Sequence, residues 1–265
     1  MPELPEVETA RRRAERALAG RRILGVAARP DPIVFEGTTP RRFARALEGR
    51  RVEAVRRRGK HLWMELDARP WPLFHFGMTG SFEIYRDRRE RPRFWKVELA
   101  MEDGTLLAMP DPRRLGRIRL RHEPEREPPV SELGFDPLLA FPPAAELRRL
   151  LLRRHAPIKA VLLDQGLFAG VGNWLADEVL YQAAVRPRRL ASDLSAAEVG
   201  RLRARLLAIV ERAVAVEADS DRFPRSWLFH DRWGNHDDAR TARGERIVHE
   251  TIGGRTAAWV PARQR

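Results

Sequence analysis

The pattern of apolar positions divides the chain into a strand-rich half and a helical half. Residues 5–19 carry apolar side chains at helical spacing opposite a run of arginines, and Gly20 marks the expected end of that helix. Residues 23–120 instead show short apolar or alternating runs separated by Gly, Pro and Asp-Gly. The runs are RVEAVRRR, HLWMEL, LFHFGM, SFEIY, WKVELAM, TLLAM and RIRLR. This pattern predicts strands, which we interpret as a β-sandwich flanked by helices.

The second half begins after a proline-rich stretch at residues 122–143, which is typical of a linker. Four helical segments follow: AAELRRLLLRR, IKAVLLDQG, NWLADEVLYQAA and SAAEVGRLRARLLAIVERAVAV. From about Ala218 the chain is polar and irregular, and it ends in two strand-like pieces, RIVHET and RTAAWVP, around a Gly-Gly turn. The whole pattern predicts an α+β protein that ends in a β-hairpin.

The charge of the chain suits a polyanionic partner. Lys and Arg number 50 against 37 Asp and Glu, a net charge of +13. Nucleic acid is the usual partner of such a protein, although codon bias in a GC-rich genome would also raise the arginine content. The absence of cysteine excludes disulfides and thiolate metal sites. With no long apolar run and no signal-peptide pattern, we expect no membrane contact and a cytoplasmic, nucleoid-associated location.

Only three residues are lysine: Lys60, Lys96 and Lys159. If genome composition favours Arg over Lys, a lysine that remains is a candidate for a role that Arg cannot fill. The lysine ammonium is compact and can lose its proton, whereas guanidinium stays charged. This argument draws attention to Lys60 in particular.

The N-terminal sequence MPELPEVE places Pro2 beside Glu3 and Glu6 at the start of a predicted helix. If Met1 is removed, Pro2 carries a free secondary amine. An α-amino group titrates at about 7.7–8.0, against about 10.4 for lysine, so more of it is neutral near pH 7. Such an amine attacks a sugar carbon to form an iminium, which is Schiff-base catalysis. The simpler interpretation is that both glutamates complement the helix dipole.

Six ordered motifs decide between these interpretations, because together they resemble the formamidopyrimidine-DNA glycosylase and endonuclease VIII family. The resemblance covers most of the chain. The motifs are MPELPEVE, RRGKHLWMEL, FHFGMTGSF, DPRRLGRI, the long segment IKAVLLDQGLFAGVGNWLADEVLYQAAVRPRRLASDLS and GGRTAAW. The long segment is similar to the helix–two-turns–helix motif of that family, and GGRTAAW to its C-terminal finger loop.

The resemblance implies a bifunctional DNA N-glycosylase and AP lyase that excises oxidised bases in base-excision repair. Pro2 would attack C1′ of the damaged nucleotide, and β- and δ-elimination would then cut the strand. Glu3 would act as general acid, with Glu6 supporting the site. Lys60 would hold phosphate and assist proton transfer. His75, Asn173 and Arg255 would grip phosphates around the extruded nucleotide.

Base flipping leaves a hole in the duplex that side chains must fill. Met78, Arg113 and Leu115 lie at the intercalating positions that the resemblance implies, and apolar wedges with arginine suit that role. Without the motif, Met78 would be assigned to the core. Leu115 replaces the usual Phe, so the wedge is smaller, and this leaves the preference for the opposite base undetermined.

The finger departs further from the family pattern. The family ends in a CxxC…CxxC zinc site, but here Arg240, Arg243, Val260 and Arg263 stand at those four positions. We therefore expect no zinc and no other cofactor, a zincless finger held by strand pairing and Trp259, and added phosphate contacts from the arginines. An alternative metal site of unusual spacing remains open, made of His230, His236, Asp237, Asp238 and His249.

The segment VEADSDRFPRS is shorter than the lesion-recognition loop usual in the family. Oxidised pyrimidines, formamidopyrimidines and hydantoins are therefore substrates as well supported as 8-oxoguanine, and the extent of elimination stays open.

We assign residues 1–125 to a catalytic β-sandwich domain, 134–217 to a helix–two-turns–helix DNA-binding domain and 226–265 to a zincless finger. The expected partner is double-stranded DNA containing damaged bases, held by a monomer in a basic cleft between the domains. Two alternatives remain. One is a non-catalytic protein of the same fold that binds lesions or abasic sites, and the other is an unrelated basic RNA-binding protein.

Overall fold

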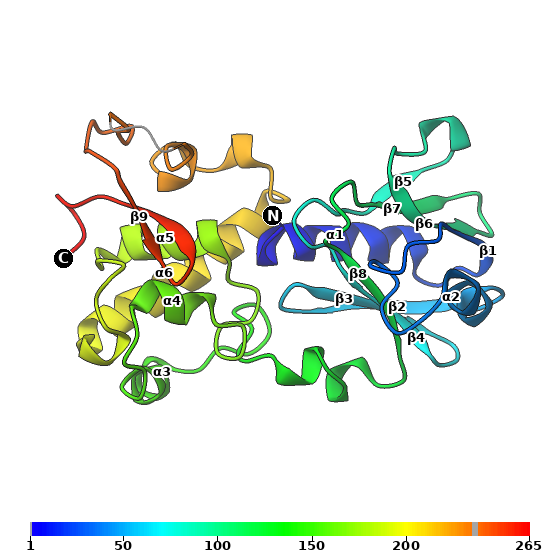
Figure 1. Ribbon diagram of the computed structural model, residues 1–265, viewed down its shortest axis with the longest axis horizontal. Coiled ribbons are helices and arrows are strands. Elements are labelled where there is room, and N and C mark those ends of the chain that lie inside the picture. The colour runs from blue at the N-terminus through cyan, green and yellow to red at the C-terminus, as the bar shows by residue number, and fades with distance from the viewer. Residues whose placement is uncertain (1, 235–237) are drawn as a thin grey trace. The chain divides into compact units, whose positions relative to one another are not determined.

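The computed structural model describes residues 2–234 and 238–265. Contacts between residues divide the chain into two compact units, Met1–Glu132 and Leu133–Arg265, called unit 1 and unit 2 below. Figure 1 shows strands predominating in the first and helices in the second, which confirms the predicted α+β class. No helix in the described ranges is both long and apolar enough to span a bilayer.

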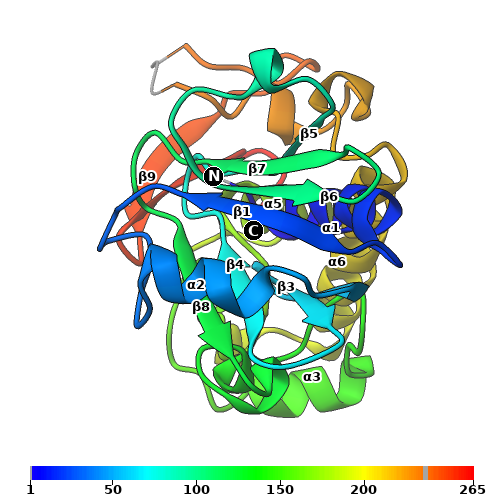
Figure 2. The same cartoon turned by 90° about the vertical axis from the view of Figure 1, so that its right-hand side faces the viewer.

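Unit 1 contains two four-stranded antiparallel sheets (Figures 1 and 2). One sheet has the order β1 (Ile23–Ala28), β6 (Trp95–Met101), β7 (Leu106–Pro110), β5 (Glu83–Tyr85). The other has the order β2 (Val52–Arg58), β3 (His61–Leu66), β4 (Trp71–His75), β8 (Arg117–Arg121). Each of the seven runs singled out by the apolar pattern overlaps one of the strands β2 to β8, whereas β1 was not among these runs.

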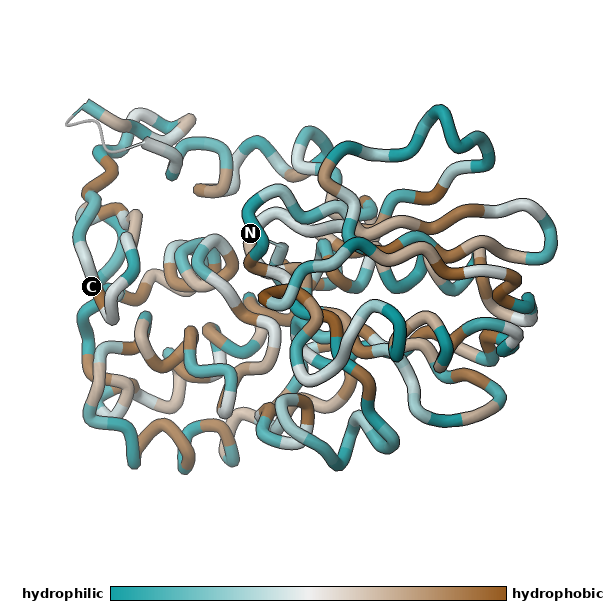
Figure 3. The backbone as a smooth tube through the Cα atoms, turned by 45° about the vertical axis from the view of Figure 1, so that its right-hand side comes forward, coloured by the Kyte–Doolittle hydropathy of each residue, from teal (hydrophilic) through white to brown (hydrophobic). Residues whose placement is uncertain are grey.

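Alternation along the strands builds the core of unit 1, because successive side chains of a strand point to opposite faces. The inward-facing members share one buried cluster: Leu62, Met64 and Leu66 from β3, and Val97, Leu99 and Met101 from β6. Figure 3 shows the complementary pattern, with hydrophilic colour concentrated in the connecting loops.

Two α-helices flank these sheets. Helix α1 (Leu4–Leu18) begins one residue before the predicted start and packs on β2 and β3. Helix α2 (Pro40–Leu47) was not predicted, although its sequence carries a start signal. The Thr39 side chain accepts a hydrogen bond from the Arg42 amide at 3.2 Å, and a proline follows directly after it. Phe43 and Leu47, one helical turn apart, are buried against β1 and β4.

Unit 2 contains four α-helices and one β-hairpin within its described residues. The helices are α3 (Ala144–Leu151), α4 (Ile158–Leu163), α5 (Asn173–Ala183) and α6 (Ala196–Ala215), and the hairpin pairs β9 (Val248–Ile252) with β10 (Arg255–Trp259). Helix α6 begins with a capping box, in which Ser195 and Glu198 exchange side-chain and backbone hydrogen bonds. All four helices and both strands lie where the sequence pattern predicted them.

Short 3-10 helices complete the chain: η1 (Arg88–Glu90), η2 (Pro124–Arg126), η3 (Val130–Glu132), η4 (Ala191–Asp193), η5 (Ser220–Arg222) and η6 (Leu228–His230). Two of them, η2 and η3, lie in the proline-rich stretch that precedes unit 2.

The fully buried carboxylate of Asp177 on α5 joins three other parts of unit 2. Its Oδ1 accepts a hydrogen bond from Lys159 of α4 at 2.5 Å. Its Oδ2 accepts one from Arg232 at 2.6 Å and one from the Ala258 amide of β10 at 3.2 Å. A buried charge is tolerated only when it is paired and hydrogen-bonded. Asp177 therefore fixes the hairpin and the segment before it against the helices.

We predict that Asp177→Asn lowers the free energy of unfolding of unit 2 by about 3–5 kcal/mol, because the substitution removes the carboxylate that Arg232 binds in a buried site. Hydrogen exchange measured by mass spectrometry should accelerate across β10, where the Ala258 amide loses its charged acceptor. The matched control is Asp193→Asn, since among the described residues the exposed Asp193 carboxylate accepts a hydrogen bond only from the neighbouring Ser192 hydroxyl. Exchange in β10 that matched the control would contradict the assignment.

Candidate active site

The three N-terminal residues that the sequence singled out lie at the start of α1, where Pro2 precedes the helix, Glu3 is its N-cap and Glu6 lies in its first turn. The amide of Glu3 donates to Oε2 of Glu6 at 3.0 Å, and the Glu3 carbonyl accepts from Val7 at 3.0 Å. Glu3 is buried, with 2 % of its surface exposed, while Pro2 is partly exposed. The backbone directly after Pro2 is thus fixed by the helix, and Glu6 has a positioning contact. Met1 lies outside the described residues.

A buried ion pair connects α1 to the turn that carries Lys60. Glu8 of α1 binds the buried Arg57 of β2 at 3.0 Å, and Arg57 also donates to the carbonyl of Gly59 at 2.9 Å. Burial alone would raise the pKa of Glu8, but hydrogen bonds from Arg11, Arg12 and Arg57 lower it to about 2. The carboxylate therefore stays charged at neutral pH and holds the β2–β3 turn, where Gly59 has φ +56°.

His75 lies opposite His61 in the β3–β4 register, with 4.8 Å between ring centroids. Burial and the nearby charge of Lys60 lower the pKa of His75 to about 4, while burial and His75 itself lower that of His61 to about 3. Both rings are neutral at pH 7. Nδ1 of His75 accepts from the Gly77 amide at 3.2 Å, so the ring proton is on Nε2. His75 is therefore a neutral hydrogen-bond donor beside a cation.

We predict that these two histidines make the fold acid-sensitive below pH 6.5. The unfolded chain binds protons at about pH 6.5, whereas the folded rings do so only near 4 and 3, so stability falls as pH decreases through this window. Each ring contributes up to about 1.4 kcal/mol per pH unit there. The free energy of unfolding, measured from pH 7 to 4.5, should decrease less steeply with falling pH in the double variant His61→Gln/His75→Gln than in wild type. The exposed control His155→Gln should retain the wild-type slope.

The segment after β4 packs directly on the loop after β7. Gly77 has φ +63°, and a Cβ added there would lie 2.4 Å from the carbonyl carbon of Leu115. The buried Asp111 joins the same two segments, because its side chain accepts from the Thr79 hydroxyl at 3.3 Å and from the Gly116 amide at 2.7 Å. The structure therefore brings the backbones that carry Met78 and Leu115 into contact.

The loop after β7 is rigid at its base and exposed at its tip. Arg114, with φ +57°, binds the buried Asp31 at 2.9 and 3.1 Å, and Lys96 binds the same carboxylate at 2.9 Å. Arg113 is exposed and forms no ion pair with any described residue, and Leu115 is 40 % exposed. The three predicted wedge residues, Met78, Arg113 and Leu115, lie on these two packed segments outside the buried core.

We predict that Gly77→Ala displaces both wedge segments, because the added methyl group meets backbone atoms that cannot rotate away. The expected destabilisation is about 1–3 kcal/mol, and affinity for DNA should fall with it. Gly104→Ala is the control. Gly104 has a similar φ of +83°, but nothing lies within 4 Å of its Cβ position. If Gly77→Ala and Gly104→Ala had the same affinity for DNA and the same free energy of unfolding, close packing at Gly77 would not position the wedge segments.

In unit 2, Asn173 opens α5 at the end of a glycine-rich turn. Gln165 organises this turn, since its side chain donates to the Leu163 and Val171 carbonyls and accepts from the Gly170 amide. The backbone carbonyl of Asn173 accepts from the buried Lys159 at 2.8 Å. The side-chain Oδ1 of Asn173 is buried and has no partner among the described residues. Helix N-termini provide amide groups for anions, so the location suits the predicted phosphate contact.

Arg255 lies at the tip of the β9–β10 hairpin, directly after Gly253 and Gly254, which have φ of +58° and +73°. Its side chain is exposed and unpaired within the described part of the chain. The turn itself lies close to α4, because a Cβ added at Gly253 would lie 3.0 Å from the Cβ of Ala160. At the other end of the hairpin, the buried Trp259 ring lies under the Arg186 guanidinium. The hairpin is thus held at both ends while the Arg255 side chain stays exposed.

The alternative metal-ligand set is only partly testable, because His236 and Asp237 lie outside the described residues. Nε2 of His230 contacts the Phe223 carbonyl at 3.3 Å, and Nε2 of His249 contacts the Arg232 carbonyl at 3.1 Å. Among residues 2–234 and 238–265, no three potential ligands form a cluster.

Sequence reasoning missed the residues that position the site: Glu8, Arg57, His61, Asp31, Arg114, Asp111 and Asp177. For Glu8, Arg57, His61 and Asp177 the signal is a polar side chain at an apolar position of a helix or strand, which indicates burial but does not identify the partner. Asp31, Asp111 and Arg114 lie in loops, where no periodic pattern marks them. The structure also explains two of the three lysines. Lys96 pairs with Asp31 and Lys159 with Asp177.

Comparisons with known proteins cover both units. Residues 1–118 match the family model for the formamidopyrimidine-DNA glycosylase N-terminal domain, and residues 133–224 match that for its H2TH domain. A formamidopyrimidine-DNA glycosylase of Arabidopsis thaliana is 40% identical over 278 residues, covering 100% of this chain and 71% of its own. The protein of the same name from Geobacter metallireducens is 32% identical, with 98% of both chains covered.

Solved structures give the same result. The Lactococcus lactis formamidopyrimidine DNA glycosylase, bound non-covalently to DNA containing an AP site, has a TM-score of 0.86 at 25% identity, with 99% of each chain covered. MutM in complex with DNA containing carbocyclic 8-oxo-G has a TM-score of 0.87 at 26% identity, with 100% of each chain covered. The chain therefore belongs to the formamidopyrimidine-DNA glycosylase family.

Proposed function

We propose that this protein is a DNA glycosylase of base-excision repair that removes oxidised bases and then cuts the strand as an AP lyase. The observation that carries the proposal is the first turn of α1, where a buried Glu3 directly follows Pro2 and is held through Glu6. The family relationship supports the glycosylase activity. The lyase step rests on the chemistry available at Pro2.

In the proposed reaction, the secondary amine of Pro2, free once Met1 is removed, attacks C1′ of the damaged nucleotide. The bond from C1′ to the base breaks, the base leaves with the electron pair of that bond, and the proton lost from the Pro2 nitrogen balances the charge of the leaving base. Glu3 protonates the sugar ring oxygen, so the ring opens to an iminium. Loss of a C2′ proton then expels the 3′ phosphate, and a second elimination releases the 5′ phosphate.

The other predicted residues would bind and distort DNA. Lys60 and the neutral His75 would contact phosphates beside the flipped nucleotide, as would Asn173 and Arg255 of unit 2. Met78, Arg113 and Leu115 would fill the hole in the duplex, and their location on two packed, partly exposed segments supports this role. We retain residues 1–125, 134–217 and 226–265 as the catalytic, helix–two-turns–helix and finger domains.

We propose that the finger needs no zinc. The chain has no cysteine, and the hairpin is joined to the helices through Asp177 and Trp259. The proposed partner is duplex DNA with damaged bases, bound by a monomer in the cytoplasm at the nucleoid.

The substrate range within oxidised bases stays open. Residues 216–226 form a short segment, anchored where Phe223 packs on Trp174 at 5.7 Å between ring centroids. Because the segment is short, 8-oxoguanine, formamidopyrimidine, hydantoin and oxidised pyrimidine all remain candidates. A panel of duplexes, each with a single lesion, separates these candidates.

We predict that borohydride traps a covalent complex between the wild-type protein and DNA that contains an abasic site or an oxidised base. Pro2→Gly should reduce trapping by at least about 100-fold, because it replaces the secondary amine, which forms the iminium directly. The matched control is Pro5→Ala, which alters the first turn of α1 but leaves the amine. The readout is the cross-linked band on a denaturing gel.

Two results would count against the proposal. Equal trapping by wild type and Pro2→Gly would exclude Pro2 as the nucleophile. Tight binding of lesion DNA by wild type without trapping or incision would favour the non-catalytic alternative.

A further inference from the structure

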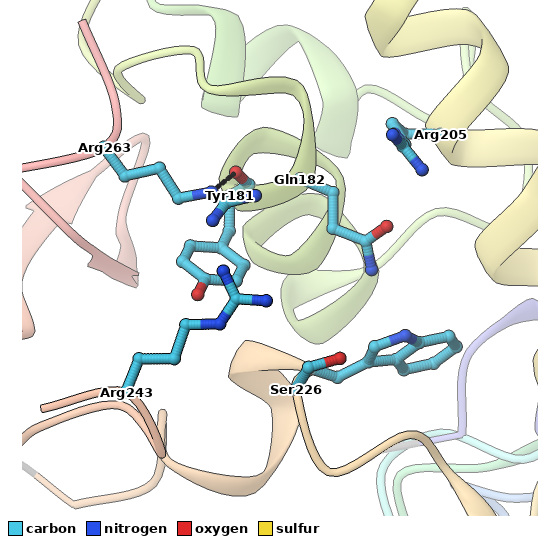
Figure 4. Close-up of a pocket in the computed structure, with 7 residues that line it drawn as sticks. Tyr181, Gln182, Arg205, Ser226, Arg243 and Arg263 are labelled. Carbon is cyan, nitrogen blue, oxygen red and sulfur yellow. Dashed lines mark hydrogen bonds between the residues drawn. The ribbon is translucent and has the colours of Figure 1, made fainter. Parts of the chain in front are cut away.

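A pocket in unit 2 is lined by three arginines from three separate segments (Figure 4). Arg205 comes from α6, Arg243 from the turn before β9, and Arg263 from the segment after β10. Tyr181 and Gln182 of α5, with Ser226 and Trp227, complete the lining. The pocket has a volume of about 130 Å³. None of its lining residues belongs to the proposed active site.

The Arg263 side chain and the backbone of Arg243 are held in defined places. The Arg263 guanidinium lies over the Tyr181 ring at 4.6 Å and donates through Nε to the Tyr181 carbonyl at 3.1 Å. Arg243 belongs to a turn closed by Thr241, which accepts from the Arg243 amide through its hydroxyl and from the Gly244 amide through its carbonyl. Figure 4 shows Arg243 and Arg263 reaching toward Tyr181 from different segments. The terminal nitrogens of both side chains therefore stay available.

The pocket lining carries an excess of positive charge, with three arginines and no carboxylate. Across the described residues, no carboxylate forms an ion pair with Arg205, Arg243 or Arg263, although ion pairs are frequent elsewhere in the chain. The nearby carboxylate of Glu245 accepts from the hydroxyls of Tyr181 and Thr241 and offsets only part of the charge of three arginines. Confined like charges of this kind concentrate anions from solution.

A pocket in unit 1 provides a contrast within the same chain. It is lined by Arg69 and Arg126 together with Glu123. Glu123 binds both arginines, at 2.9 and 3.3 Å. Arginines that line a pocket in this protein can thus be paired by a carboxylate of the same pocket. Among the described residues, the unit 2 pocket has no such partner for its arginines.

We propose that the pocket lined by Arg205, Arg243 and Arg263 binds a phosphate-class anion. Guanidinium groups recognise phosphate through paired N–H donors, and the Ser226 hydroxyl and the Gln182 amide add neutral donors. The volume is below the about 300–1,000 Å³ typical of sites for larger organic ligands. The ligand is therefore a single phosphate group, either free or in the backbone of DNA.

The test measures thermal unfolding in inorganic phosphate against chloride at equal ionic strength. Phosphate at ten times its Kd should raise the midpoint of the wild type by about 3–6 °C. Arg243→Gln and Arg205→Gln should lose most of that shift. Both side chains are exposed and make no bond within the described residues, so their midpoints in chloride should match wild type. Arg212→Gln on α6 is the matched control and should behave as wild type.

General salt stabilisation acts equally on all four proteins, so only the difference between pocket and control variants carries the result. A phosphate shift that is absent in wild type, or equal in the pocket variants and the control, overturns the proposal.

A second measurement identifies the source of the phosphate, using undamaged duplex DNA at several salt concentrations. If the pocket binds a backbone phosphate, a plot of the logarithm of the DNA association constant against the logarithm of salt concentration is less steep for Arg243→Gln. The magnitude of its slope is smaller by about one than that of Arg212→Gln. If Arg243→Gln loses the midpoint shift in phosphate but keeps the slope of the control in DNA binding, the site binds free phosphate. Neither arm needs a lesion or turnover, so failure here leaves the proposed glycosylase untouched.

Discussion

Three buried carboxylates that bind cations hold the predicted functional segments in place, because a charge removed from water is costly unless it is paired and hydrogen-bonded. In unit 1, Glu8 binds Arg57 and so connects α1 to the turn that carries Lys60. Asp31 binds Arg114 and fixes the base of the loop that presents Arg113 and Leu115. In unit 2, Asp177 binds Lys159 and Arg232 and also accepts the Ala258 amide. Each ion pair joins segments distant in sequence.

The residues that hold the loops in place are different from the residues that are exposed for binding DNA. The buried cations have partners within the protein, whereas Arg113 and Arg255, at the tips of their loops, are exposed and unpaired among the described residues. Unpaired arginines on rigid supports are suited to phosphates and to an opened base stack, because little conformational freedom is lost on binding. The neutral state of His75 fits the same scheme, since a neutral donor beside Lys60 avoids a second adjacent charge.

Much of the fold could be predicted from local pattern. Alternating runs located the sheet strands, and helical spacing located α1 and α3 to α6, because periodicity and end signals act over a few residues. Helix α2 was not predicted, because it is short and its N-cap residue Thr39 lies among turn residues. The candidate residues Pro2, Lys60, His75 and Arg255 came from ordered motifs and not from periodicity. Their roles stay predictions.

The sequence by itself determined the α+β class, the order of the elements, the family resemblance and the absence of cysteine ligands, because these depend on residue identity and near neighbours. Only the tertiary structure decided which buried charges meet. Nothing local pairs Glu8 with Arg57 or Asp177 with Arg232. It also decided that Gly77 packs on the backbone at Leu115, and that burial beside Lys60 keeps His75 neutral. Pairing, packing and desolvation depend on distances between segments, which no linear pattern contains.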